Sequence, residues 1–512
     1  RTRRGNTGYV VNVIRDMPLI RAGMYDDLER LRWTSEDFRF QGDTCVILKT
    51  PEWRKGFFAG EEVSVSFIVS NFSDADIEKP SFRWGTSRPP GFPSGKSYWE
   101  AHKPEKPLEL IPRGEVIEIW HPSVRVDGAE APTPLDVHFQ LKGESANSWR
   151  LWFFNKPEWQ KYEGVYVHTP GYADMTKYMP EAPTWDETKS PIPEDARLIF
   201  SDVFTRKILD FVKDGGRAIV LASNWPGAFG AIEHSYWRDV PFIPRSVWTE
   251  TEAQAILELQ PYDLVRSYSL VVPTGEQGIA DKVQPMLRLL DTHDLSEVAI
   301  YDQLFETRIG KGTLAVAALD FSTPAGQWLL SVVVARLLTN DPPMAKSLTD
   351  EEAEAFSVPT PYSLIPLTGN WKFSLDPKEE GVEKGWHLRE FDDSSWRDLP
   401  VARHWEGFGI NYDGWAWYRR WVEIPEEMAG KNVELIAEGI DDVYEVYVNG
   451  KFVKFHGDMK LGHPEGSVWL KRTVTEVGDF LKPGEVNLIA IRVLDWTGAG
   501  GIWKLIYLAV GG

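Results

Sequence analysis

Short runs with apolar residues at every second position fill the chain from about residue 36 to 158. Examples are EEVSVSFIVSN (61–71) and LDVHFQLKG (135–143), and Gly/Pro-rich turns such as TSRPPGFPSGKS separate them. A period of two between turn signals is typical of half-buried strands in an antiparallel sandwich. The lone cysteine, Cys45, lies in the apolar run TCVILK and is expected to be an inert thiol in a buried strand.

A different pattern, strand then helix, occupies about residues 159–345. The apolar runs ARLIFS (196–201) and RAIVLAS (217–223) flank TRKILDFVKDGG (205–216), whose apolar positions lie on one helical face and whose paired glycines suit a helix end. GTLAVAALDF followed by AGQWLLSVVVARLLT repeats the order. Near-continuous apolar strands that alternate with helices indicate a parallel sheet covered on both faces.

Alternating runs return in the last part, 346–512. Its first residues, within NDPPMAKSLTDEEAEAF, have the proline and acidic content of a linker. Further on, DVYEVYVNGKFVKFHG places Asn449–Gly450 between two alternating runs, a strong hairpin signal because both positions of a type I′ turn require positive φ. We therefore predict a second β-sandwich, of the jelly-roll type, so that two sandwiches flank an α/β domain.

Composition restricts the partners of this chain more than it identifies them. With 76 Asp+Glu against 56 Lys+Arg, the formal net charge is −20, which argues against nucleic acid and anionic membranes and is neutral toward an uncharged sugar. No apolar run approaches the length of a membrane span. The 23 Trp residues suit sugar stacking, but they suit sandwich cores equally well. A single cysteine fits the cytoplasm without excluding secretion, so the compartment stays open.

The chain opens with RTRRGNTGYVV, which has neither an initiating Met nor the apolar core of a signal peptide. We expect that it is cut from a longer protein.

Segments of the last part resemble the sugar-binding domain of glycoside hydrolase family 2, the family of β-galactosidases and β-glucuronidases. The matching pieces come in the family's order: LTGNWKFSLDP, FDDSSWRDLPVARHWE, YDGWAWYRRWVEIP, GIDDVYEVYVNGKFVKFHG, VTEVGDFLKPGEVNLIAIRV and GAGGIWKLIYL. The resemblance implies a galactose-binding-like jelly roll over 346–512. Residues 1–35 look like the end of a catalytic (β/α)8 barrel, with Asp16 where the family often has an acidic residue after the last strand.

The family resemblance extends to the domains between the barrel end and the jelly roll. Residues 36–158 are similar to the immunoglobulin-like sandwiches of these enzymes, and 159–345 look like a class I glutamine-amidotransferase-like module, which implies a flavodoxin-like α/β fold. Catalysis in that module needs a Cys on a strand-to-helix elbow, but Cys45 lies in another domain and Ser223 in LASNWPG is more simply a loop residue. We expect a domain without a nucleophile that serves packing and homo-oligomer contacts.

Hydrolysis of a glycoside needs two carboxyl groups that flank the scissile bond. In barrels of this family they lie on strands before the last one, so the resemblance places both upstream of Arg1. The acidic segments NYDGWAW, GIDDVY and LDWTGAGG are present in this chain, but nothing in the sequence indicates that any two converge. The full-length protein is thus expected to be an O-glycosyl hydrolase, and this segment its accessory part.

Candidate ligand contacts come from the same resemblance. Asp495 matches the position of an Asp that reaches substrate hydroxyls in family members, and Trp496 beside it offers a stacking face. Tyr412, Asp413 and Trp415 form a second candidate group. Trp417 and Trp421 share a strand face with Arg419, and we expect core or interface roles for them.

No cofactor is expected, and the ten His residues form no metal-binding motif. A structural Ca²⁺ held by loop carboxylates, for example in GDMKLGHPEGS, stays open. Two alternatives to the accessory fragment also remain, a stand-alone carbohydrate-binding protein and a scaffold that builds an oligomer.

Overall fold

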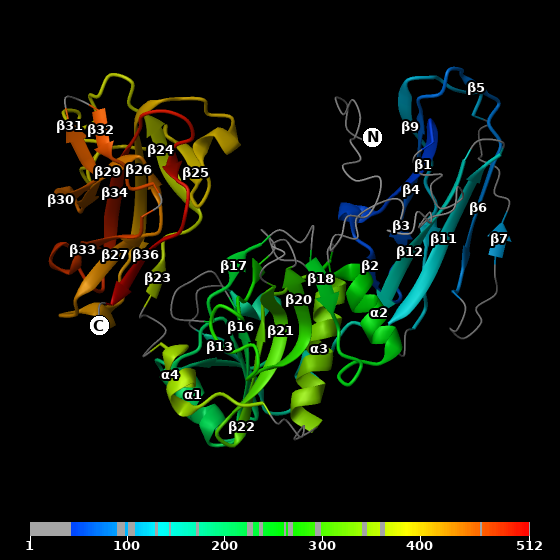
Figure 1. Cartoon of the computed structure of the whole chain (residues 1–512), viewed down its shortest axis with the longest axis horizontal. Coiled ribbons are helices and arrows are strands. Elements are labelled where there is room, and N and C mark those ends of the chain that lie inside the picture. The colour runs from blue at the N-terminus through cyan, green and yellow to red at the C-terminus, as the bar shows by residue number, and fades with distance from the viewer. Residues whose placement is uncertain are drawn as a thin grey trace.

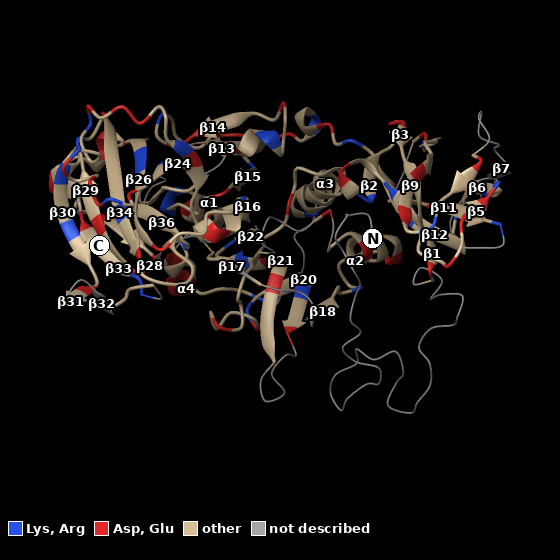
Figure 2. Cartoon of the chain, turned by 90° about the horizontal axis from the view of Figure 1, so that it is seen from above, with Lys and Arg blue, Asp and Glu red and all other residues tan. Residues whose placement is uncertain are grey.

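The computed structural model describes residues 42–510 except 90–97, 101–107, 129–131, 143–144, 170–173, 223–228, 235–238, 261–262, 265–269, 292–297, 340–345, 359–363, 461–462 and 470. The predicted barrel end with Asp16 lies outside the described residues, and so does Ser223. Figure 1 shows an α/β part between two all-β parts. Among the described residues, acidic and basic positions are interspersed along all three parts in Figure 2.

The first all-β part consists of two main sheets, ordered β1-β4-β9 and β2-β12-β11-β6-β7. Side chains alternate along β11, and the inward set (Val137 and Phe139) meets Val46 and Phe67 of the other sheet in one core. Cys45 lies in β1 and is buried, as predicted. The strands are β1 Thr44–Lys49, β2 Gly56–Phe58, β3 Val63–Ser64, β4 Ser66–Asn71, β5 Ile77–Glu78, β6 Phe82–Ser87, β7 Tyr98–Glu100, β8 Leu110–Ile111, β9 Glu115–Trp120, β10 Ser123–Val124, β11 Thr133–Leu141 and β12 Ser145–Phe154.

The α/β part has one sheet of eight strands in the order β14-β13-β15-β16-β22-β21-β20-β18. The first five run parallel, whereas β21, β20 and β18 are antiparallel to their neighbours. The strands are β13 Val165–Thr169, β14 Thr184–Asp186, β15 Leu198–Ser201, β16 Arg217–Leu221, β18 Asp239–Phe242, β20 Gln284–Asp291, β21 Ala299–Ile309 and β22 Gly312–Ala317, with a separate pair β17 Ile232–Glu233 and β19 Leu270–Val271.

The sheet is therefore mixed, and not purely parallel as the sequence pattern indicated. Strands β21 and β22 are separated by Gly310 and Lys311 alone, and Gly310 has φ 57°. A two-residue turn joins antiparallel strands, since a parallel return needs a long crossover. The turn signal was present in the sequence as RIGKGTL.

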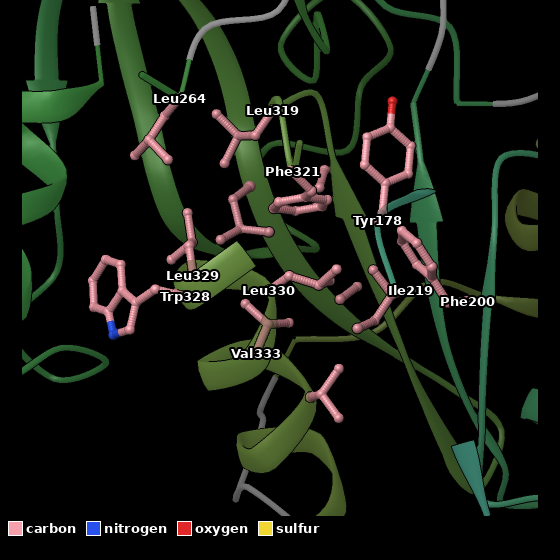
Figure 3. Close-up of a cluster of buried hydrophobic side chains, with 14 of the residues drawn as sticks. Tyr178, Phe200, Ile219, Leu264, Leu319, Phe321, Trp328, Leu329, Leu330 and Val333 are labelled. Atoms are coloured by element: carbon pink, nitrogen blue, oxygen red, sulfur yellow. The ribbon is translucent and has the colours of Figure 1, made fainter. Parts of the chain in front are cut away.

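Helices cover both faces of this sheet. Successive strand residues point to opposite faces, so Ile199 and Val220 pack under α1 (Arg206–Lys213), while Phe200 and Ile219 pack with α3 (Pro324–Thr339). Figure 3 shows Leu330 and Val333 of α3 beside this second set. Helix α2 (Glu250–Leu259) belongs to the same cluster as α3.

The segment expected as a linker contains a helix that packs on the α/β core. Helix α4 (Asp350–Ala355) begins with a capping box of Thr349 and Glu352, and Ala353 is buried with the residues of α1. The Val358 backbone then exchanges hydrogen bonds with the Phe204–Arg206 segment. The acidic composition reflects helix capping here, because carboxylates are favourable in a first turn.

The first sandwich and the α/β part share a packed contact. Phe154 stacks on Trp328 with ring centroids 4.8 Å apart, and the Trp152 Nε1–H donates to Glu258 Oε2 over 2.8 Å. The Asp263 carboxylate accepts the backbone N–H groups of Lys55 and Gly56. Burial is the largest cause that raises the pKa of Asp263, to about 6.

The C-terminal sandwich has a six-stranded sheet, β25-β24-β26-β34-β29-β30, and a four-stranded sheet, β23-β36-β27-β33. Its core joins the inner faces of both sheets. The strands are β23 Leu364–Pro366, β24 Asn370–Leu375, β25 Arg397–Pro400, β26 Gly414–Glu423, β27 Val433–Ala437, β28 Ile440–Asp441, β29 Val443–Val448, β30 Lys451–His456, β31 Asp458–Lys460, β32 His463–Gly466, β33 Thr473–Glu476, β34 Val486–Asp495, β35 Gly501–Ile502 and β36 Ile506–Val510.

The predicted Asn449–Gly450 hairpin joins β29 to β30, with φ of 50° and 84° at the two turn residues. Asn449 has a second role that the turn signal did not reveal. Its side chain accepts the Leu488 N–H and donates to Phe480 O and Asn487 Oδ1, which ties the turn to β34.

Residues 376–396 lie over the outer face of the six-stranded sheet. Arg419 is buried there, as expected for a core role, and its guanidinium pairs with Asp393 and donates to backbone carbonyls of the covering segment, including Leu388 O. Trp417 is also buried, and its Nε1–H donates to Asp376 Oδ2. Trp421, further along the strand, stays 42% exposed.

Candidate functional site

Strand register brings three acidic loops together at one end of the C-terminal sandwich. Gly414 of β26 lies opposite Asp495 of β34, and Val443 of β29 lies opposite Leu494. Asp413 and Asp442 therefore flank the end of β34 from its two sides. The segments NYDGWAW, GIDDVY and LDWTGAGG, which the sequence could not relate, meet here.

Two further carboxylates complete this group. Asp441 lies in β28, which pairs with β35 at Gly501. Glu406 lies in the 3₁₀ turn Trp405–Phe408, and its Oε2 accepts the Gly500 N–H over 3.1 Å. We call Glu406, Asp413, Asp441, Asp442 and Asp495 the end-loop cluster.

The glycines of the last loop permit this close packing. A Cβ at Gly500 would lie 2.5 Å from Asp495 Oδ2 and 2.4 Å from the Trp405 ring. Gly501 has φ 107°, which disfavours other residues. The GAGG sequence thus lets the chain pass directly over the Asp495 carboxylate.

Asp495 is fully buried in an acidic environment. Within the part of the chain that the structure describes, neither of its carboxylate oxygens has a hydrogen-bond partner of ordinary length. Burial first, and then the charges of Asp413, Glu406 and Asp442, raise the pKa of Asp495 to about 7, and the Thr497 backbone offsets this only in part. Such a carboxyl exchanges its proton near neutral pH.

The pKa of Asp441 is also raised. Burial, followed by a hydrogen bond and the charge of Asp442, raises the pKa of Asp441 to about 8, with contributions from Asp495 and Glu406. The end-loop cluster therefore mixes protonated and charged carboxyls at neutral pH, and it offers both donors and acceptors.

The five sequence-predicted ligand residues separate into two groups. Asp495 and Asp413 belong to the end-loop cluster, and Trp496 adjoins it. The Trp496 backbone N–H donates to Asp442 Oδ2 over 3.0 Å, and the residue is 45% exposed. Tyr412 is half-buried beside them, with its hydroxyl bonded to Trp415 O.

Trp415 lies elsewhere. It is buried with Val443, Leu494 and Phe455, and the Arg492 guanidinium lies 3.9 Å from the centre of its ring. Its neighbour Ala416 belongs to the inner core, so Trp415 points to the outer face of the sheet. In this position its ring packs against protein.

Sequence reasoning missed Glu406, Asp441 and Asp442 as partners of Asp495. The residues are 89, 54 and 53 positions before Asp495 in the chain. Their proximity depends on pairing between distant strands, which no local pattern reveals.

The α/β part holds a buried polar network at the carboxyl ends of its first strands. His168 Nδ1 lies 2.9 Å from Ser201 Oγ, and His168 Nε2 lies 3.5 Å from Glu187 Oε2. Thr205, the N-cap of α1, donates to the same Glu187 oxygen. The Ser201 side chain is fully buried and also bonds the Val203 backbone, so the network holds the strand ends to α1.

His234 Nε2 lies 3.8 Å from Asp291 Oδ2, and the His234 ring packs on Tyr301. Among the described residues, no group of three or more His, Cys, Asp or Glu side chains has an arrangement that could hold a metal ion. None of the helices in the described part is long and apolar enough to cross a bilayer.

The C-terminal domain is a two-sheet sandwich whose end loops bring carboxyl groups together beside the exposed Trp496. Residues 364–504 match the family model "Glycosyl hydrolases family 2, sugar binding domain". This domain belongs to that family, and through it the chain is related to glycoside hydrolases of family 2.

Curated relatives agree with this assignment over a limited length. The β-galactosidase of Vibrio cholerae is 25% identical over 151 residues, which cover 26% of this chain and 14% of that protein. The β-galactosidase of Thermoanaerobacterium thermosulfurigenes is 25% identical over 162 residues, 29% of this chain and 21% of that protein. This chain thus spans a small fraction of the length of these relatives.

Solved structures with local similarity include two β-glucuronidases. That of Ruminococcus gnavus is 22% identical, with 29% of each chain covered and a TM-score of 0.25. That of Lactobacillus rhamnosus is 19% identical, with 29% of this chain and 28% of that chain covered and a TM-score of 0.25.

Proposed function

We propose that this chain is the accessory, sugar-presenting part of a glycoside hydrolase that acts on terminal β-linked sugars, in the manner of a β-galactosidase. The observation that carries the proposal is the end-loop cluster with exposed Trp496, within a domain of the family 2 sugar-binding type. The names of the curated relatives support the β-galactosidase direction.

Binding would use groups at the surface of the end-loop cluster. Asp413 is exposed and Asp442 is partly exposed, so their carboxylates can accept hydrogen bonds from sugar hydroxyls. The Trp496 indole offers an apolar face for a sugar ring. Asp495 lies buried among these acids, where its protonation controls the local charge.

We further propose that 159–345 form a flavodoxin-like, amidotransferase-like domain without a nucleophile. The parallel strands β14-β13-β15-β16-β22 have the order 2-1-3-4-5, which supports the flavodoxin-like assignment. Residues 36–158 and 346–512 are the two sandwiches of this division.

The α/β domain is proposed to mediate homo-oligomer contacts. Edge strand β18 carries Val240 and Phe242, which are 52% and 47% exposed on one side of the strand. Pro241 between them removes a backbone donor, so the contact would use side chains more than strand addition. Light scattering tests this: an oligomer should fall to a monomer in Val240→Glu/Phe242→Glu, and an unchanged mass rejects the contact.

Direct measurement of sugar binding tests the main proposal. Titration calorimetry of the 512-residue chain with galactose should give binding that Trp496→Ala and Asp442→Asn both weaken. Trp421→Ala is the matched control, because Trp421 is about equally exposed in the same sandwich and its ring lies beside Arg389, away from the end-loop cluster. Equal heats in all variants, or none in the wild type, would reject the proposed site.

A second candidate function is glycoside hydrolysis by the end-loop cluster itself. The raised pKa of Asp441 and Asp495 beside other carboxyls favours it, since hydrolysis needs a protonated acid next to an ionised partner. A chromogenic β-galactoside separates the two. Turnover by this chain that both Asp441→Asn and Asp495→Asn abolish supports hydrolysis, and its absence supports the accessory role.

A further inference from the structure

A group of aromatic side chains lies next to the end-loop cluster on loops that no candidate site included. The Trp503 ring is stacked on His404, with centroids 4.8 Å apart and planes 10° from parallel, and Trp469 lies 6.0 Å from Trp503. We call His404, Trp469 and Trp503 the aromatic shelf. Trp469 is its most exposed member, at 43%.

Contacts within the protein fix the position of the rings of the aromatic shelf. The Trp503 Nε1–H donates to Trp469 O over 2.9 Å, and Lys504 Nζ lies 4.5 Å from the centre of the Trp503 ring. Gly439 is required beneath it, because a Cβ there would lie 2.8 Å from Trp469 O and 3.0 Å from Trp503 Nε1. Rings that are fixed before a ligand arrives lose little entropy on binding.

Short connections join the shelf to the end-loop cluster. Ser467 Oγ donates to Asp442 O over 3.2 Å and accepts the Trp469 N–H over 3.3 Å. On the other side, the Trp496 N–H donates to the Asp442 carboxylate. Asp442 therefore connects the backbones of Trp469 and Trp496, two residues with exposed side chains, through Ser467 on one side and directly on the other.

Two exposed indoles whose backbones are connected through an acidic residue suit a chain of uncharged sugars. Each sugar ring has an apolar face that packs on an indole and hydroxyls that donate to carboxylates. An anionic ligand would approach Glu406, Asp413 and Asp442 against their charge, which disfavours uronic acids and nucleic acid. A single sugar ring would occupy one indole and leave the other uncovered.

We propose that the aromatic shelf is a second sugar subsite, so that this end of the sandwich takes a neutral oligosaccharide of at least two residues, one near Trp496 and the next on Trp469. The inference rests on the proposed function and specifies its ligand. Asp442 serves both subsites as the shared hydrogen-bond acceptor.

The test compares two ligands on the complete 512-residue chain. Galactose and β-1,4-galactobiose are titrated by calorimetry into the wild type, Trp469→Ala and the control Trp421→Ala. The wild type should bind the disaccharide more tightly than galactose. Trp469→Ala should lose about tenfold in affinity for the disaccharide, as expected for one lost stacking contact, and keep its affinity for galactose.

The possible outcomes distinguish a failure of the second subsite from a failure of the proposed function. Equal disaccharide affinity in the wild type and Trp469→Ala overturns the subsite and leaves the galactose site intact. If Trp469→Ala loses affinity for both galactose and the disaccharide, with the circular dichroism spectrum unchanged, Trp469 contacts the first sugar and the second subsite is overturned. No binding of either ligand to the wild type overturns the proposed function itself.

Discussion

Replacing Asp495 by Asn removes a buried charge without changing the shape of the side chain, and it should stabilise the C-terminal sandwich at neutral and alkaline pH. The folded state raises the pKa of Asp495 from 3.8 to about 7. A difference of about 3 pH units corresponds to roughly 4 kcal/mol of lost stability once the group ionises, taken as an upper limit.

The direction of the pH dependence results from the raised pKa. Between the unfolded and folded pKa values the folded protein binds more protons than the unfolded chain, so stability falls as the pH rises from about 4 to about 7. Asp441 titrates in the same cluster with its pKa raised to about 8, so part of the effect is shared and the two contributions do not add.

Hydrogen exchange of amides in β34 measures this effect locally, because unfolding of a chain with several domains has no single free energy. Between pH 5 and pH 8 the protection free energy of the wild type should decrease, and Asp495→Asn should show a smaller decrease. Asp458→Asn, at an exposed position of the same sandwich, is the control. A variant less stable than the wild type at pH 8 would refute the account of a buried, unfavourable charge.

Three further predictions concern other contacts. Arg419→Ala leaves Asp393 without its partner and uncaps the carbonyls of residues 376–396, so it should cost about 3–5 kcal/mol and expose this segment to limited proteolysis; unchanged cleavage would contradict that role. Asn449→Ala should lower the protection free energy of amides in β29 and β30 by about 2 kcal/mol in hydrogen exchange, because it removes hydrogen bonds to Leu488 and Phe480 at a positive φ, and an effect near zero would exclude this link. Glucuronic acid should bind more weakly than galactose at pH 8 and the difference should shrink at pH 5, as measured by calorimetry; equal affinities would show that the end-loop cluster does not exert its charge on the ligand.

Local signals in the sequence predicted much of the β and α structure. The Asn449–Gly450 turn, the buried strand around Cys45 and the helix that begins after Thr205 all depend on residues close together in the chain, and the structure confirms them. The Thr349–Glu352 capping box was equally local, but the acidic composition around it favoured a linker.

Features that depend on pairing between distant strands could not be predicted. The meeting of Asp413, Asp442 and Asp495 depends on register, and register is set by packing across the whole sheet. The antiparallel turn between β21 and β22, by contrast, had a local signal in RIGKGTL that the strand–helix pattern outweighed. Conversely, Trp415 is close to Asp413 in sequence but does not belong to the end-loop cluster. It shared a segment with Asp413, yet the alternation along β26 turns it to the outer face of the sheet, against Arg492.

The central claim is that the end loops of the C-terminal sandwich hold a neutral sugar. A crystal structure of the 512-residue chain soaked with β-1,4-galactobiose tests it most directly. We predict one sugar ring against Trp496 with a hydroxyl bonded to Asp442, and the second ring on Trp469. Clear density for the sugar at another surface, with these residues uncovered in the crystal lattice, would contradict the claim.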